Sequence, residues 1–143
     1  MAGKYTFLAR SFAVWLIIIA AETINGAMRE IFVVPVVGIH LAKQISFASA
    51  IVLITVITLY FIQWIGATEL RGLLVVGLLW AVLTFAFEVI LSMGVAGLNW
   101  AKIIADFNPL SGGLMSYGLA YLLVIPVITF SILAVVHPAI RSS

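Results

Sequence analysis

The chain has 143 residues, of which 65% are hydrophobic and only 8% are charged. Because soluble proteins carry roughly 25% charged residues, this composition excludes a water-soluble domain and indicates an integral membrane protein, with the lipid bilayer as a partner. The net charge of +2, without any run of basic residues, argues against nucleic acid as a partner, and the lack of cysteine excludes disulfides and cysteine-based metal sites.

Four segments are long and apolar enough to cross a bilayer, which requires about 20 mostly apolar residues. We expect these spans at residues 11–32, 45–65, 70–93 and 114–136. The connections between them are short, so neighbouring helices are expected to lie antiparallel. The predicted fold is an all-α integral membrane bundle of four transmembrane helices that forms a single domain, residues 1–143.

The connections contain their own signals. The first, VVPVVGIHLAKQ, carries Pro35 and Gly38 as helix breakers. In the third, NWAKIIADFN is predicted to form a short interfacial helix over residues 99–108, because its charged residues lie away from an apolar face made by Trp100, Ile103, Ile104 and Phe107. In the last span Pro126 predicts a kink, since proline removes a backbone hydrogen bond.

Basic residues predict the orientation of the chain in the membrane. One side carries Lys4, Arg10, Arg71 and Arg141, and the other carries Lys43 and Lys102, with Arg29 added if it belongs to the loop. The positive-inside rule then places both termini in the cytoplasm. An alternative interpretation takes the first 21 residues as a signal peptide with Ala21 at the cleavage position.

A polar stripe runs along the first span, where Glu22, Asn25, Gly26 and Arg29 share one side of a helix. With Arg10 at the inner boundary and a rise of about 1.5 Å per residue, Glu22 lies about 18 Å deeper, near the middle of a hydrocarbon core about 30 Å thick. We therefore expect the stripe to face the bundle and not the lipid.

Depth also suggests an ion pair between the first and third spans. Arg29 lies about 28 Å from Arg10, and Glu88 lies about 25 Å from Arg71, which is also taken as an inner-boundary residue. An unpaired charge near the hydrocarbon core costs about 2.5–3.5 kcal/mol, so we predict that Arg29 and Glu88 pair, with Glu30 left to face the outer water.

Glu22 has no basic residue at its own depth. It is either a neutral, hydrogen-bonded clamp between helices or a proton- or cation-binding group, because intramembrane ionisable residues are candidates for functional sites. By the same estimates Glu22 and Glu88 differ in depth by about 7 Å or more, which is too far for them to share one proton.

Sequence signals for catalysis and for cofactors are weak. His40 and His137 are expected at opposite membrane faces, so they cannot ligate one haem together. Metalloprotease and nucleophile-elbow motifs are missing, Asp106 is the only aspartate, and Ser111 is expected to cap the fourth span. We therefore expect no catalytic residue, no metal and no other cofactor.

Aromatic residues near the span ends are typical of a membrane-interface belt, formed here by Trp15, Trp64, Trp100, Tyr117 and Tyr121. Trp80 is the exception near mid-span, where it packs against a partner, lines a pocket or faces lipid. Gly77 and Ala81 form a small-xxx-small pair that would let another helix approach closely.

The stretch AAETINGAMR resembles the first helix of small multidrug resistance transporters, over about ten residues. Those proteins have four short spans and a membrane-embedded glutamate that exchanges protons for cationic drugs, so the resemblance implies that Glu22 is a coupling carboxylate. More broadly, ETINGAMREIFVVPVVG and LNWAKIIADFNPLSGG resemble features of small four-helix bacterial membrane proteins without an assigned activity, which implies a bacterial inner membrane location.

Three functional hypotheses follow. The first is a non-enzymatic accessory or interaction subunit that packs against itself or against a larger membrane complex, and it requires a small-residue or aromatic face turned outward. The second is a small proton-coupled transporter or channel built around Glu22, which must then face a water-accessible cavity. The third is a lipid- or quinone-binding site near Trp100 and Tyr117.

Overall fold

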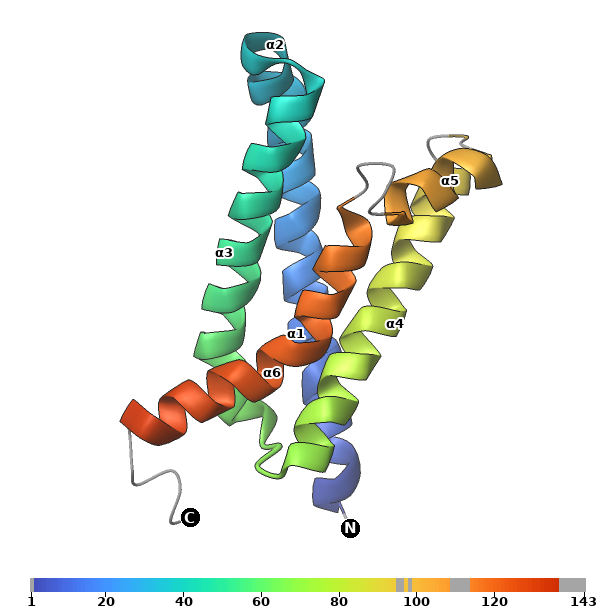
Figure 1. Cartoon of the computed structure of the whole chain (residues 1–143). Coiled ribbons are helices and arrows are strands. Elements are labelled where there is room, and N and C mark those ends of the chain that lie inside the picture. Colours follow the sequence, from blue (N-terminus) through green and yellow to red (C-terminus); the bar gives the residue numbers. More distant parts are fainter. Residues whose placement is uncertain (1, 95–96, 98, 109–113, 137–143) are drawn as a thin grey trace.

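The computed structural model describes residues 2–94, 97, 99–108 and 114–136, and the regular elements within them are all helices (Figure 1). In chain order these are α1 (Ala2–Met28), the π-helix η1 (Arg29–Val33), α2 (Val34–Val37), α3 (Ile39–Ile65), α4 (Leu70–Gly94), α5 (Trp100–Phe107) and α6 (Met115–Val136).

Among the residues that the structure describes, four helical stretches are long and apolar enough to cross a membrane: Thr6–Val37, Ile39–Ile65, Leu70–Gly94 and Met115–Val136. The short helix α5 lies between the third and the fourth of them. The predicted all-α bundle of four spans with a short intervening helix is therefore confirmed, and the bounds predicted for the last two spans agree with α4 and α6 to within one residue.

The four long helices close a ring, because α1 packs on α3, α3 on α6, α6 on α4, and α4 on α1. We call the end with the start of α1 the base of the bundle, and the end with α2 and α5 the top (Figure 1). The α1–α3 hairpin rises as a close pair, whereas α4 leans away from α1 towards the top. Contact between α1 and α4 is therefore concentrated in the lower part of the bundle.

The first connection differs from its prediction, because the helix continues through Pro35 and breaks only at Gly38. A wide π turn precedes Pro35, in which the Val34 N–H donates to the Arg29 carbonyl. The wider turn makes room for the Pro35 ring, which would clash with the preceding turn of a regular α-helix. Gly38 has φ of 85° and ψ of 167°, which glycine adopts readily. As a result α3 begins at Ile39, six residues before the expected start.

The apolar core lies in the lower part of the bundle and is formed by Val14, Trp15, Ile18, Ile19, Ile54, Ile62, Ile65, Ala67, Leu73, Val76, Trp80, Leu122 and Ile125. Residues before Ala21 supply part of this core, so the fold uses the segment that the signal-peptide alternative would remove. Beyond Ile19 the described part of α1 adds no buried hydrophobic residue, and neither η1 nor α2 contains a buried residue.

Two tryptophan hydrogen bonds join α1 to α4. The Trp80 indole donates to the Ser11 carbonyl at 2.9 Å, and the Trp15 indole donates to the Thr84 hydroxyl at 3.0 Å. Trp80 is therefore a core residue, and Trp15, which was expected at the membrane interface, is only 7% exposed and also belongs to the core. In both pairs the α4 residue lies 69 positions further along the chain, so the two helices run parallel in this register.

The helices α4 and α6 approach each other closely at Gly77. A Cβ atom added to Gly77 would lie 2.1 Å from the Leu123 carbonyl oxygen, so this contact requires glycine. The predicted close approach at the Gly77 and Ala81 pair is thus confirmed at Gly77. Pro126 lies inside α6, which bends near its middle, as its position predicted (Figure 1).

Candidate functional site

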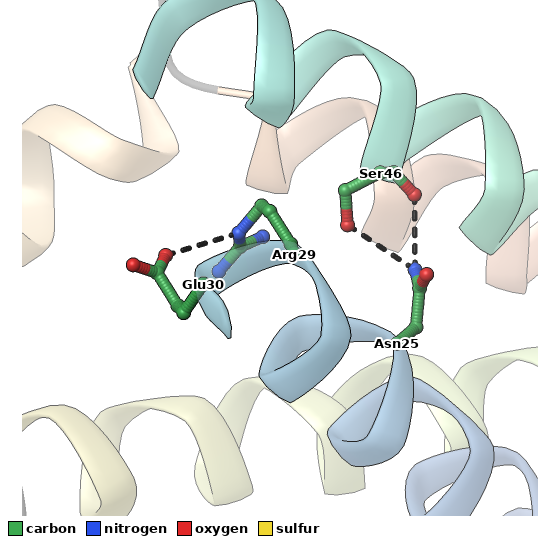
Figure 2. Close-up of polar contacts among 4 residues, drawn as sticks. All are labelled: Asn25, Arg29, Glu30 and Ser46. Atoms are coloured by element: carbon green, nitrogen blue, oxygen red, sulfur yellow. Dashed lines mark hydrogen bonds and ion pairs between the residues drawn. The ribbon is translucent and has the colours of Figure 1, made fainter. Parts of the chain in front are cut away.

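The polar stripe of α1 meets α3 through Asn25. The Asn25 side-chain nitrogen donates to the Ser46 carbonyl at 3.0 Å and to the Ser46 hydroxyl at 3.2 Å (Figure 2). Ser46 is buried, so these bonds join the two helices above the apolar core. Asn25 therefore faces the bundle, as we expected for the residues of the polar stripe.

Glu22 lies below Asn25 on the same side of α1. Its Oε1 atom is fully buried and has no hydrogen-bond partner among the described residues. Asn25 lies beside the carboxyl group, and Glu88 of α4 is close enough for an electrostatic interaction with it. The two carboxyl groups, both on half-buried residues, therefore lie within electrostatic range of each other.

The register of α1 and α4 accounts for this approach. It places Glu88 level with Ile19, which lies three residues below Glu22, or about 4.5 Å along the helix axis. The sequence estimate of about 7 Å or more assumed that Arg10 and Arg71 are level, and the two tryptophan bonds correct that assumption.

Arg29 forms an ion pair with Glu30, with 3.2 Å between Nε and Oε1 (Figure 2). The two side chains are 30% and 59% exposed. The register places Glu88 ten residues below Arg29, or about 15 Å, so it does not favour the expected Arg29–Glu88 pair, which stays a prediction. Glu30 is exposed, as expected, but it is paired with Arg29.

A face of small residues lies next to this ion pair. Thr23, Gly26, Ala27 and Glu30 occupy positions i, i+3, i+4 and i+7, the spacing of a single helix face. Thr23, Ala27 and Glu30 are exposed, and the Thr23 hydroxyl donates to the Ile19 carbonyl at 2.7 Å. We call these four residues the α1 face, although Glu30 belongs to η1, which continues the helix. The sequence signal for this face is the stretch TINGAMRE, which also contains Asn25 and Arg29 of the polar stripe.

Trp100 and Tyr117, the two expected interfacial residues, are both exposed. The helix α5 packs on α6 and buries Ile103, whereas Trp100 and Ile104 remain exposed. Its first turn is capped by the Asn99 side chain, which accepts a hydrogen bond from the Lys102 backbone at 3.0 Å. This arrangement suits a helix at a membrane interface, with apolar side chains left for lipid.

The other two aromatic residues of the predicted belt take part in contacts between helices. Tyr121 shares a hydrogen bond with the Thr55 hydroxyl and so joins α6 to α3. The Arg10 guanidinium lies over the Trp64 ring at 5.2 Å and donates to the Trp64 carbonyl at 2.8 Å, near the end of α3.

Metal-binding groups do not gather in the part of the chain that the structure describes, where no three His, Cys, Asp or Glu side chains come together. His40 is exposed at the start of α3, whereas His137, Ser111 and the Asp106 side chain lie outside the described residues. An open surface groove of about 370 Å³ lies on the lower part of α4, away from both carboxyl groups, and is lined by Leu70, Arg71, Leu74, Val75 and Leu78.

The chain matches no family model, and neither a curated protein nor a solved structure matches it. The resemblance of the first helix to small multidrug resistance transporters therefore stays a prediction.

Proposed function

We propose that this protein is a non-enzymatic interaction subunit of the bacterial inner membrane, and that its α1 face packs against a further transmembrane helix. The observation that carries the proposal is the outward exposure of Thr23 and Ala27 at helical spacing, with the half-buried Gly26 between them. This is the outward small-residue face that an interaction subunit requires.

Physical reasoning about lipid supports this use of the face. Lipid tails are as apolar as leucine, so membrane helices associate through close packing and polar contacts, and small residues permit that packing. The chain already uses this device internally, where Gly77 lets the α6 backbone approach α4. The α1 face offers the same kind of surface on the outside of the bundle.

Assembly in a membrane-like environment tests the proposal. We expect the native protein in a mild detergent to migrate as an assembly larger than one 15.5 kDa chain. Ala27→Leu should weaken that assembly about tenfold or more, because packing a large side chain into a close contact costs about 1–3 kcal/mol. Ala86→Leu on the exposed side of α4 is the matched control and should migrate like the native protein. Equal migration of all three proteins would contradict the proposal.

A second function is favoured by the buried, unpartnered Oε1 atom of Glu22 and the neighbouring Glu88. Two charged carboxylates repel strongly in a medium of low dielectric, so this pair would suit the binding of a proton or a cation in a transporter or channel. Vesicles that contain the purified protein and a pH-sensitive dye test it. Proton flux that Glu22→Gln abolishes supports transport, whereas the interaction function predicts that Glu22→Gln assembles normally and that neither protein carries flux.

A further inference from the structure

We infer that the helix that packs on the α1 face is the α1 helix of a second copy of this chain, arranged in parallel around a two-fold axis along the membrane normal. The inference rests on the proposed interaction function and names its partner. Its basis is the ion pair of Arg29 and Glu30, which lies partly exposed at the upper end of the α1 face.

Depth in the membrane is the first argument. Two copies that insert in the same direction place identical residues at the same depth. Arg29 and Glu30 are adjacent, and so differ in depth by only about 1.5 Å. In a parallel pair, Arg29 of each copy is therefore level with Glu30 of the other. An isologous interface requires this kind of self-complementarity, because every contact must occur twice.

The position of the arginine side chain is the second argument. A Cβ atom on Gly26 would lie 3.9 Å from an Arg29 terminal nitrogen, so the guanidinium lies along the Gly26 side of α1, next to the α1 face. The ion pair uses only Nε of Arg29, and a guanidinium has further donors. In a pair of α1 helices these donors lie next to the partner's carboxylate, and the four charges alternate in sign.

The small residues of the α1 face, below Arg29 and Glu30, allow the two α1 helices to approach each other closely. Thr23 and Ala27 are exposed, and the Thr23 hydroxyl is already bonded to its own helix. Two α1 helices can therefore pack closely over the lower part of the α1 face without leaving a polar group unpaired. The charge cluster at the upper end then fixes their register and their parallel orientation.

Cysteine cross-linking tests the contact directly, because the chain has no native cysteine. In native membranes treated with an oxidant, Ala27→Cys should form a disulfide-linked dimer of this chain. Ala86→Cys, which is also exposed but lies on α4, should remain monomeric. A monomeric Ala27→Cys protein, or equal cross-linking at both positions, would overturn the inference.

Charge reversal tests the reciprocal pairing. On the Ala27→Cys background, Arg29→Glu gives a copy with two acidic residues and Glu30→Arg gives a copy with two basic residues. When the two are co-expressed in equal amounts with different tags, the ratio of mixed dimers to like dimers should rise about fivefold above the statistical ratio, because each like dimer brings charges of one sign together whereas the mixed dimer keeps opposite charges together. A statistical mixture would show that Arg29 and Glu30 bond only within one copy and would overturn the reciprocal arrangement.

The two proposals fail in different ways. If Ala27→Cys forms a cross-link to a protein of another mass, the second copy is the wrong partner while the interaction function stands. If Ala27→Cys forms no cross-link and Ala27→Leu also leaves the migration of the protein unchanged, both proposals are wrong.

Discussion

The Trp80 indole nitrogen lies 2.9 Å from the Ser11 carbonyl oxygen and donates a hydrogen bond to it from within the core. One turn higher, Trp15 donates to Thr84 in the opposite direction, from α1 to α4. These two bonds fix the register of the parallel pair α1 and α4. This register decides which side chains of α1 and α4 lie at the same depth in the bundle.

Trp80→Phe should therefore lower the stability of the bundle. The substitution removes the indole donor and leaves space in the core, so the expected loss is about 1–3 kcal/mol. Unfolding of the reconstituted protein with increasing denaturing detergent measures it. Trp100→Phe on the exposed side of α5 is the control and should change stability by less than about 0.5 kcal/mol. Equal losses for both variants would contradict the core assignment of Trp80.

Gly77→Ala tests the contact between α4 and α6. The added Cβ would lie 2.1 Å from the Leu123 carbonyl oxygen, so the two helices must separate, at a cost of about 1–3 kcal/mol or more. Gly72→Ala on the same helix is a matched control, because its Cβ would meet the Ala67 side chain at an ordinary 3.4 Å. That control should be neutral or more stable by about 0.5–1 kcal/mol, since alanine favours a helix. The same unfolding measurement serves both variants, and a stabilising Gly77→Ala would show that the helices are further apart.

Asn25 and Ser46 should respond unequally to truncation. Asn25→Ala removes both of its hydrogen bonds to Ser46, with an expected loss of about 0.6–1.5 kcal/mol. Ser46→Ala removes only the hydroxyl contact and keeps the 3.0 Å bond from Asn25 to the Ser46 carbonyl, so its loss should be smaller. Stability measurements on the two single variants decide the order, and a larger loss for Ser46→Ala would show that the hydroxyl carries the contact.

The four spans were predictable because length and apolar composition alone decide whether a helix can cross a bilayer. The break after the first span was less predictable, since Pro35 is the stronger signal in the sequence. The π turn accommodates the Pro35 ring within the helix, and the chain reverses at Gly38 instead. Such a local exchange of hydrogen-bond partners leaves no trace in the apolar pattern.

The relative depth of two helices was not predictable. Arg10 and Arg71 are both basic residues at the start of a span, and the sequence estimate therefore places them at the same depth. A charged side chain on a long stem reaches the interface from several depths, so it does not fix a register. The buried bonds of Trp80 and Trp15 do fix it, but nothing in the sequence pairs them with Ser11 and Thr84.

The register of α1 and α4 predicts a different outcome for Glu88→Lys from the one that an Arg29–Glu88 pair would give. If Glu88 paired with Arg29, the substitution would place two cations together and destabilise the bundle. With Glu88 about 4.5 Å from the level of Glu22, the lysine instead gains a carboxylate partner inside the membrane.

We therefore expect Glu88→Lys to be at least as stable as the native protein, and Glu22→Lys to behave in the same way. The Glu22→Lys/Glu88→Lys double variant places two cations at one depth, where an unpaired charge costs about 2.5–3.5 kcal/mol, and should be clearly less stable than either single variant. Expression level and detergent unfolding of the three variants measure this order. A Glu88→Lys protein that is less stable than the double variant would show that the two glutamates do not face each other.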